Sequence, residues 1–477
     1  MRQHRLDEVP EEARDAILAL QDELELPREF PEEVLQQAES LLSNPPSSKD
    51  LLDRTDIEFV TIDPESSMDL DQALHIEREG DGYLVHYAIA DVGHWIEPGS
   101  PIDLEAHRRG QTLYAPGARI PLHPPALSEN AGSLLADGRP RPAVLWSHHL
   151  DSSGEVVSST AQRALVLNRH KLSYDSVQAD IDAGRAHPSV ELLPEVGKLR
   201  QAIEQRREGI SLNLPEQEIV PANGDWTLAF RQLHEVEDWN AQISLLTGFV
   251  AAQKQIEAGI GILRTLPPAE QRDVDRLRRQ AATIGVPWHK DMTYPDFVRS
   301  LSPNDPKELA VLMKCTVLFR GAGYLAFDGG APAGNNKHNA LGAEYAHTTA
   351  PLRRLVDRYV LETCVSLDAG QPVPDWVREE LDALPETMGK SGQRANRYEN
   401  AVMSIAEALV LKGHVGELFE GVLVDVNPKT RRGTVQIPES AVELHVSANP
   451  NAVGEVIRVR VDSVDIREGK VELTRVN

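Results

Sequence analysis

One short acidic stretch constrains this chain more than any other feature. Residues 63–72 (DPESSMDLDQ) directly follow the apolar run 57–62, and they contain Asp63, Asp69 and Asp71. In an extended chain Asp69 and Asp71 project from the same face, and Asp63 closes the strand before them. Crowded carboxylates repel one another unless a cation lies between them, and Mg²⁺ prefers such oxygen ligands. Two such ions about 4 Å apart are the usual device for attack at a phosphodiester.

Two other interpretations of the stretch have to be weighed. A solvated acidic turn that only caps a strand would show the same residues. A helix–loop–helix calcium site is excluded by spacing, because Ala73 stands where the next ligand should be and no glycine follows. The rest of the chain therefore has to decide between a metal site and an idle turn.

Length and composition narrow the class of protein. A chain of 477 residues can bury a large core and form two to four domains. The hydrophobic content of 41% without an apolar run of membrane length predicts a soluble globular protein with no membrane partner. The charged residues 1–10 lack a signal region, and Cys315 and Cys364 form no C-x-x-C pair, so we expect a cytoplasmic protein without zinc or disulfides. The net charge of −25 argues against diffuse charge-driven nucleic-acid binding, although a basic channel remains compatible with it.

The pattern of the chain predicts an α+β fold, with strands first and helices afterwards. Residues 1–50 form an acidic region with helices at 10–24 and 32–42, compatible with a helix-turn-helix, followed by a linker. The strands expected next span 57–62, 72–77, 83–90, 143–149 and 154–167. The helices expected after them span 239–258, 269–284, 306–318, 351–367, 374–383 and 393–412.

A separate small β domain is expected at the C-terminal end. Its five strands span 418–426, 433–437, 442–446, 455–466 and 470–474. Five short strands in about sixty residues fit an OB-type barrel. A barrel used for protein contact is the alternative. We therefore predict a large α+β domain over residues 51–413 and an OB-fold domain over residues 414–477.

With these pieces placed, the chain resembles the ribonuclease II (RNB) family of 3′-to-5′ exoribonucleases over about residues 26–412. The final barrel resembles the ribosomal S-one type of OB fold. The resemblance rests on ordered motifs at 60–71, 88–94 (AIADVGH), 113–117 (LYAPG), 120–122 (IPL), 127–130 (LSEN), 171–175 (KLSYD) and 347–354 (HTTAPLRR). Two departures stand out: the family's fourth aspartate is replaced by Gln72, and the usual N-terminal cold-shock domains have no counterpart in the bacterial type of chain expected here.

The resemblance implies a role for each acidic residue. Asp63, Asp69 and Asp71 would hold two Mg²⁺ ions, with Mn²⁺ as a substitute, and Asp71 would also be catalytic. Gln72 would either complete the metal site with a neutral oxygen or lie behind it. Loss of catalysis with retention of RNA binding is a third possibility.

The resemblance also assigns the residues that would contact RNA. Arg353 would grip the scissile phosphate, and Glu399 would orient water or the sugar hydroxyl. Residues 348–351 (TTAP) predict a helix start, with a threonine for the cap and Pro351 in the first turn, which is suited to bind phosphate. A salt bridge from Arg353 to Asp357 is the ordinary alternative. The other expected RNA-binding residues are Tyr114 and Tyr174, which would stack on bases, together with His347, Arg354, Lys429, Arg431, Arg432, Arg458 and Arg460.

The expected function is Mg²⁺-dependent, processive hydrolysis of single-stranded RNA from a free 3′ end, with release of nucleoside 5′-monophosphates. We expect a monomer without an obligate protein partner. The alternative is a catalytically weakened RNA-binding protein that sequesters RNA 3′ ends, which Gln72 favours. A hydrolase of a different phosphodiester, with the barrel used for protein contact, is a further option.

Overall fold

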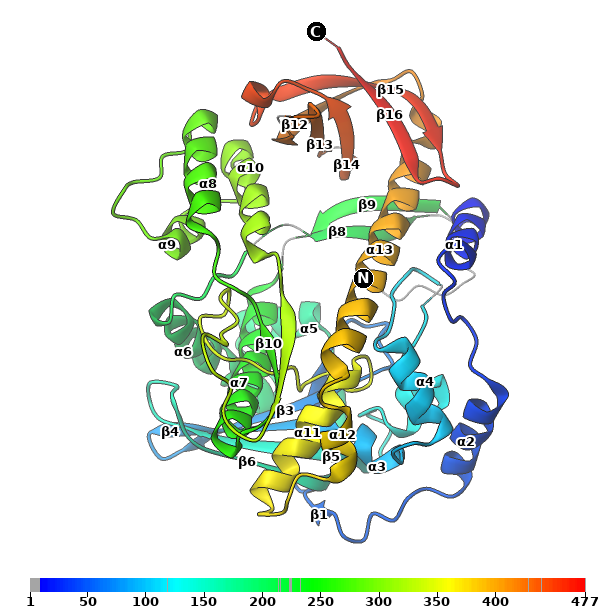
Figure 1. Ribbon diagram of the computed structural model, residues 1–477, viewed down its shortest axis with the longest axis vertical. Coiled ribbons are helices and arrows are strands. Elements are labelled where there is room, and N and C mark those ends of the chain that lie inside the picture. Colours follow the sequence, from blue (N-terminus) through cyan, green and yellow to red (C-terminus); the bar gives the residue numbers. More distant parts are fainter. Residues whose placement is uncertain are drawn as a thin grey trace.

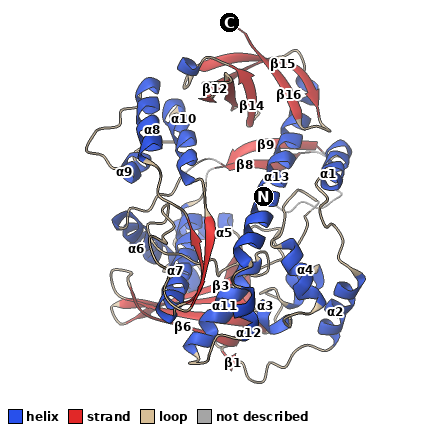
Figure 2. Cartoon of the chain, in the orientation of Figure 1, coloured by secondary structure: helices blue, strands red, loops and turns tan. Residues whose placement is uncertain are grey.

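The computed structural model describes residues 9–117, 119–212, 214, 216–222, 225–231, 233–427, 429–438 and 440–476. A large sheet and its covering helices form one end of the molecule, and a small barrel forms the other (Figure 1). Figure 2 shows strands at both ends of the molecule, and helices together with two short strand pairs between them. The predicted α+β class, strands first and helices afterwards, is confirmed.

A seven-stranded sheet supports the acidic stretch. Its strands are β1 (Leu52–Asp53), β2 (Phe59–Ile62), β3 (Gln72–Glu79), β4 (Gly82–Ala90), β5 (Arg141–Leu150), β6 (Val156–Val166) and β7 (Asn168–Leu172). Their order is β1-β6-β5-β4-β3-β2-β7, antiparallel except for the parallel pairs β1/β6 and β2/β7. Gly80 has a φ of 58° in the tight turn between β3 and β4, a conformation that favours glycine. The acidic stretch is therefore the connection from β2 to β3, near one edge of the sheet.

Both faces of the sheet are buried, because alternate residues of each strand point to opposite sides. In β4, Tyr87 and Ile89 belong to one core, and Ala88 and Ala90 belong to another. The helices of the chain are α1 (Glu11–Glu23), α2 (Glu32–Ser43), α3 (Val92–Trp95), α4 (Pro101–Arg109), α5 (Tyr174–Asp182), α6 (Leu193–Arg206), α7 (Glu235–Ala258), α8 (Gln271–Ile284), α9 (Tyr294–Arg299), α10 (Pro306–Cys315), α11 (Leu355–Asp368), α12 (Asp375–Glu380) and α13 (Leu384–Leu411). Helices α6, α7 and α11 complete the first core, and α2, α3 and α4 complete the second.

Two short β pairs lie among the helices. They are β8 (Glu216–Ala222) with β9 (Asp225–Arg231), and β10 (Ile260–Thr265) with β11 (Gly323–Asp328). The sequence analysis predicted none of these four strands. The β8–β9 hairpin contributes Ile219, Trp226 and Leu228 to the same core as the barrel and α13.

The two N-terminal helices pack against different helices of the body. Helix α1 packs against α13, where Gln21 donates a hydrogen bond to the Tyr398 hydroxyl. Helix α2 packs against α4, where Gln37 accepts the N–H of Ile102 at 2.9 Å. Each helix is thus attached separately to the body of the molecule.

The C-terminal barrel matches its expected strands closely. These are β12 (Leu418–Val426), β13 (Arg432–Ile437), β14 (Val442–Ser447), β15 (Val456–Asp465) and β16 (Lys470–Val476), in the order β14-β13-β12-β15-β16. The edge strands β14 and β16 contact each other, so the sheet is nearly closed. The barrel rests on α10 and α13, and Lys314 of α10 forms an ion pair with Asp425.

Two remaining observations concern the whole chain. Cys315 and Cys364 are both buried free thiols. Across the part of the chain that the structure describes, none of the helices has the length and apolar character needed to cross a membrane.

Candidate active site

The acidic connection from β2 to β3 is held in place by residues from two distant segments of the chain. Lys171 Nζ donates to two carbonyls of the loop, both at 2.6 Å. Ser133 Oγ donates to the carbonyl of Met68 at 2.7 Å and accepts the N–H of Leu70 at 2.9 Å. The sequence analysis did not identify either residue as an anchor of this loop, because both lie far from it along the chain. They hold the backbone that carries the three aspartates.

Asp71 is the best anchored of the three acids. Its side chain is almost completely buried, and its Oδ1 accepts the N–H of Leu352 at 2.8 Å. Its Oδ2 lies 3.5 Å from Arg353 Nε, so the predicted arginine faces the predicted acid. Burial raises the pKa of Asp71 well above its usual range, although Arg353 and the Leu352 N–H both act in the opposite direction. The structure therefore brings Asp71 of the acidic stretch next to Arg353 of the motif at residues 347–354.

The helix that was expected to present Arg353 begins later than predicted. Helix α11 starts at Leu355, and Arg354 is its extended N-cap with a φ of −145°. Among the described residues, the buried Thr348 hydroxyl has no hydrogen-bond partner, so it does not cap the helix. The prediction of a threonine cap with Pro351 in the first turn is wrong. Arg353 lies in the turn before the helix instead, with its side chain half exposed.

Asp63 and Asp69 lie in the same neighbourhood but have different partners. Burial raises the pKa of Asp63 to about 7; Asp69 adds to this rise, whereas Arg353 and Lys171 oppose it. Asp69 Oδ2 lies 2.9 Å from a guanidinium nitrogen of Arg119. Sequence analysis missed Arg119, because a single arginine in a loop carries no signal of its partner.

The donor set is chemically suited to a divalent ion, but it is not gathered as a finished site. Carboxylates whose pKa is raised by burial and by one another gain from a cation that favours their charged form, and their oxygens suit Mg²⁺. Nevertheless, no three His, Cys, Asp or Glu side chains within the described residues are close enough together to hold a metal ion. The pairing of Asp69 with Arg119 gives a physical reason, since one of the three acids is already neutralised.

Gln72 is engaged at both ends of its amide. Its Nε2 donates to the carbonyl of Thr349 at 2.6 Å, and its Oε1 accepts the Tyr87 hydroxyl at 2.6 Å. Ser244 of α7 also contacts the Tyr87 hydroxyl at 2.8 Å. Of the two roles considered for Gln72, these contacts favour a position behind the aspartates rather than a metal ligand.

Tyr114 lies beside the acid cluster, and Glu399 contacts the loop that carries Tyr114. Burial raises the pKa of the Tyr114 phenol. The charges of Asp69 and Asp71 add to this rise, whereas that of Arg353 opposes it. Burial also raises the pKa of Glu399, although a hydrogen bond from the Tyr114 N–H partly offsets the rise. The helix α13 thus brings Glu399 to the loop that carries Tyr114.

Tyr174 lies at the start of α5, near Asp63 of the acid cluster. Its helix begins with a capping box in which Ser173 accepts the N–H of Ser176. Burial raises the pKa of Tyr174 to about 12, and the charge of Asp63 adds to this rise. Both tyrosines expected to stack on bases therefore border the acidic loop.

His347 and Arg354 have partners that favour structural roles. His347 Nδ1 lies 2.8 Å from the Tyr324 hydroxyl, and burial lowers the pKa of His347 well below its usual value, so the ring is neutral at pH 7. Arg354 forms two hydrogen bonds, at 2.5 and 2.8 Å, with the fully buried carboxylate of Asp357. Asp357 therefore pairs with Arg354 rather than with Arg353.

The basic residues expected in the barrel are all exposed. They are Lys429, Arg431, Arg432, Arg458 and Arg460. Arg460 forms an ion pair with Asp462 at 2.8 Å. Lys429 and Arg431 lie on the β12–β13 turn, Arg432 begins β13, and Arg458 lies on β15.

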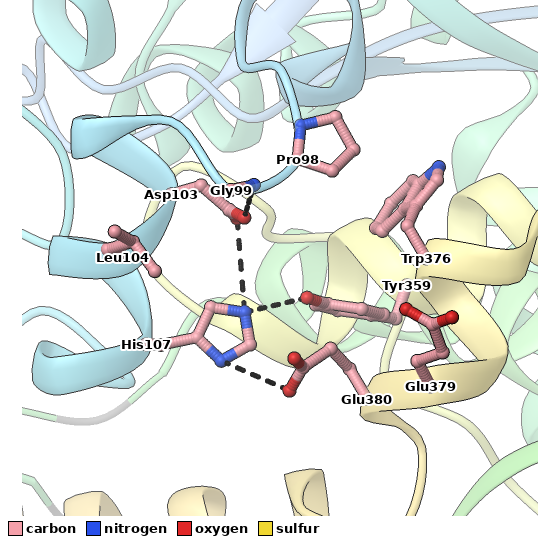
Figure 3. A pocket seen from close by; sticks show the side chains of 9 residues that line it. All are labelled: Pro98, Gly99, Asp103, Leu104, His107, Tyr359, Trp376, Glu379 and Glu380. Carbon is pink, nitrogen blue, oxygen red and sulfur yellow. Dashed lines mark hydrogen bonds and ion pairs between the residues drawn. The ribbon is translucent and has the colours of Figure 1, made fainter.

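A separate pocket of about 440 Å³ lies between α4, α11 and α12 (Figure 3). Several of its polar groups are paired. His107 Nε2 lies 2.7 Å from the Tyr359 hydroxyl, and Asp103 accepts the Gly99 N–H at 2.7 Å and binds Arg358. None of the predicted site residues lines it. We therefore regard this pocket as distinct from the acidic site.

Comparison with known families gives two matches. A family model described as an RNB domain matches residues 51–365, and a model described as an RNase II-type exonuclease C-terminal S1 domain matches residues 417–476. Ribonuclease R 1 of Lactococcus lactis is 26% identical over 464 residues, covering 90% of this chain and 54% of that protein. Ribonuclease R of Chlamydia muridarum is 26% identical over 438 residues, covering 85% of this chain and 59% of that protein. The chain thus spans less than two thirds of the length of these relatives.

Solved structures share the fold. Mycoplasma genitalium RNase R in complex with ribose methylated single-stranded RNA superposes with a TM-score of 0.86 at 19% identity, covering 98% of this chain and 78% of that chain. Yeast Ssd1, described as a pseudonuclease, gives a TM-score of 0.68 at 17% identity, covering 86% and 53% of the two chains. These likenesses support the fold and leave the chemistry to be argued from the residues.

Proposed function

The chain belongs to the RNB-domain family, and from this premise we propose that it is a metal-dependent hydrolytic exoribonuclease. It would shorten single-stranded RNA from a free 3′ end, act as a monomer, and release nucleoside 5′-monophosphates processively. Mg²⁺ is the proposed ion, with Mn²⁺ as a substitute. The cytoplasm is the proposed setting, in keeping with two free thiols. The domain limits proposed from the sequence, residues 51–413 and 414–477, accompany this proposal.

One observation carries the proposal: Arg353 and Asp71 meet beside two other acids, although 281 positions separate Asp71 from Leu352, the neighbour of Arg353. Hydrolysis of a phosphodiester has two requirements. The first is a cationic group that binds the phosphate oxygens, and the second is a set of carboxylates that hold the metal ion. The half-exposed Arg353 guanidinium supplies the first. The loop with Asp63, Asp69 and Asp71 supplies the second.

The chain's own residues suggest a division of labour. When bound, a divalent ion would polarise the phosphate and lower the pKa of water, and Asp63, Asp69 and Asp71 are the residues that would hold it. Arg353 would grip the scissile phosphate and stabilise its developing charge. Glu399, whose pKa is raised by burial, would orient the attacking water or accept a hydrogen bond from the sugar hydroxyl. Gln72 and Tyr87 would support the loop from behind.

Substrate binding would rely on stacking near the site and on charge farther away. Tyr114 and Tyr174 border the acidic loop, and each base stacked on an aromatic ring contributes about 1–3 kcal/mol. The exposed basic residues of the barrel would contact the RNA backbone. Recognition of the 2′-hydroxyl would separate RNA from DNA at the cleaved end.

A second candidate function is RNA binding without hydrolysis. Two observations favour it: Gln72 carries no charge where the family usually has an aspartate, and Arg119 already neutralises Asp69. A protein of this kind would sequester RNA 3′ ends.

A labelling experiment separates the two candidates. RNA labelled at its 5′ end is incubated with Mg²⁺, alongside RNA labelled at its 3′ end and a DNA strand of the same sequence. We expect the full-length 5′-labelled RNA to be replaced by a short end product without a ladder of intermediates, immediate release of labelled mononucleotide from the 3′-labelled RNA, and far slower cleavage of DNA. Bound but intact RNA would support the binding protein and contradict the nuclease.

A variant and its matched control test the acid cluster in the same assay. Asp71→Asn keeps the size of the side chain and removes its charge, so hydrolysis should fall by orders of magnitude while RNA affinity changes little. Asp56→Asn makes the same chemical change at an acid that is 70% exposed, and it should cleave like the unaltered chain. Equal loss of cleavage and binding in Asp71→Asn would indicate misfolding instead.

A further inference from the structure

The Arg119 side chain connects two acidic residues beside the proposed metal site. One guanidinium nitrogen lies 2.9 Å from Asp69 Oδ2, and another forms an ion pair with Glu129. The exposed fraction is only 13% for the Arg119 side chain and 8% for that of Asp69. An ion pair so far from solvent is screened weakly, so it competes strongly with any other partner of Asp69.

The backbone on each side of this bridge is well defined. Leu113 and Ile120 exchange two backbone hydrogen bonds, both at 2.9 Å, and these close the loop that carries Arg119 and Tyr114. Glu129 lies on a π-helical turn, Leu127–Ala131, a local structure often found at functional sites. The bridge therefore joins three segments: the acidic loop, the Tyr114 loop and the π-helical turn.

The charges of the bridge suggest what happens when a divalent ion arrives. One guanidinium is shared between two carboxylates, so Arg119 can lose Asp69 and still keep Glu129 as a partner. A divalent ion next to Asp69 would attract the carboxylate and repel the guanidinium. This exchange would also explain why no three acids are gathered at the site within the described residues.

We propose that Arg119 is a built-in counter-cation for Asp69, which a divalent ion must displace before the site can fill. Arg119 thereby sets the metal concentration that the protein requires, and Glu129 holds the displaced guanidinium. This inference rests on the proposed function, because it assumes that Asp69 is a metal ligand. Arg119 is a positioning residue and takes no part in the chemical step.

Direct metal binding without RNA tests the inference. Free Mn²⁺ is titrated against the full chain and followed by its paramagnetic resonance signal. Arg119→Gln should bind Mn²⁺ about tenfold more tightly, which corresponds to about 1.4 kcal/mol. Glu129→Gln should bind it more weakly, because the guanidinium then has Asp69 as its single partner in the bridge. The double variant should behave like Arg119→Gln, since Glu129 acts only through Arg119.

A control variant and a second measurement distinguish an effect of Arg119 from a general effect of removing one positive charge. Arg139→Gln removes the same charge from an arginine that is 70% exposed and paired with Asp137, and it should leave Mn²⁺ binding unchanged. Thermal unfolding supplies a second measurement. In EDTA, Arg119→Gln should melt below the unaltered chain, because Asp69 has lost its counter-charge, and saturating Mn²⁺ should raise its melting temperature more.

The failure of this inference can be told apart from failure of the proposed function. If the unaltered chain binds Mn²⁺ and Arg119→Gln binds it equally or more weakly, the inference is overturned and the metal-dependent function stands. If Arg119→Gln loses RNA affinity with unchanged Mn²⁺ binding, Arg119 is a phosphate ligand and the inference is again overturned. If neither the unaltered chain nor any of the variants binds Mn²⁺, both proposals fall.

Discussion

Both ends of the Gln72 amide are hydrogen-bonded, and these contacts would not accommodate a charged side chain at this position. Its Nε2 needs an acceptor and finds the Thr349 carbonyl at 2.6 Å, and its Oε1 accepts the Tyr87 hydroxyl. An aspartate here is shorter by one methylene and has no N–H for Thr349. Two oxygens would then face each other in a half-buried position, which is unfavourable without a donor between them.

We therefore expect Gln72→Asp to destabilise the protein rather than to improve its metal site. The loss of one buried hydrogen bond should lower the free energy of unfolding by about 1–3 kcal/mol. The Mn²⁺ concentration that half-fills the site should not fall. Urea unfolding and Mn²⁺ titration measure the two effects, and Gln72→Glu controls for side-chain length. A clear fall in the half-filling concentration would mean that position 72 reaches the metal.

Among single residues, the sequence analysis identified those that form a recognisable pattern with their neighbours in the chain. Asp63, Asp69 and Asp71 are recognisable because they crowd one loop. The residues that hold or neutralise them come from distant segments: Arg119 lies 50 positions from Asp69, and Lys171 lies more than 100 positions from the loop carbonyls that it binds. Pairing across the fold leaves no local pattern, so such partners could not have been found without a structure.

Among the elements, α11 shows how a buried acid can override a capping signal. Asp357 in its first turn accepts the Ala350 N–H at 2.7 Å and binds Arg354 through two hydrogen bonds. This arrangement keeps residues 350–354 in a turn, so the helix starts only at Leu355. It also aims the Leu352 N–H and Arg353 at Asp71.

Breaking the Asp357–Arg354 pair should therefore destabilise the folded protein. Asp357→Asn leaves the charge of Arg354 half-buried without its counter-charge, and we expect a loss of about 3–5 kcal/mol in the free energy of unfolding. The double variant Arg354→Gln with Asp357→Asn should lose less than the sum of the two single changes, because no unpaired charge remains. Urea unfolding of all four proteins measures this coupling. Strictly additive losses would contradict the pair's proposed role.

The elements that sequence analysis predicted best are those with clear periodicity. The strands of the barrel alternate apolar and polar residues, and β12 was predicted with the bounds that the structure shows, Leu418–Val426. Helices α4, α5 and α6 were missed. Two of them carried usable start signals, namely Pro101 after Ser100 and the Ser173 cap, but they are short and their apolar residues are sparse.

At the scale of the whole molecule, one buried acid joins helix α13 and strand β8 to the barrel. Glu407 of α13 accepts the Gln217 side-chain N–H of β8 at 3.0 Å and the Glu443 N–H of β14 at 2.8 Å. Gln217 also donates to the Ala441 carbonyl at 2.8 Å. Helix α13 runs from the sheet end to the barrel (Figure 1), so this contact lies where the two ends of the molecule are linked.

The ionisation of Glu407 should make this link depend on pH. Burial raises the pKa of Glu407 to about 7, although both hydrogen bonds lower it. A folded-state pKa above the unfolded one means that folding favours the protonated acid. Its stabilising contribution is full below about pH 4.5 and is lost as the pH rises to about 7. A shift of this size corresponds to about 3 kcal/mol at most.

We expect the variant Glu407→Gln to remove this dependence, because an amide stays neutral and its oxygen still accepts both hydrogen bonds. The melting temperature of the unaltered chain should fall between pH 5 and pH 8 by more than that of Glu407→Gln, and the difference between the two profiles isolates this one group. Glu420→Gln, at an exposed position on β12, is the matched control and should follow the unaltered profile. If Glu407→Gln loses as much stability over this range as the unaltered chain, the acid is ionised in the fold, and the junction with the barrel does not respond to its protonation.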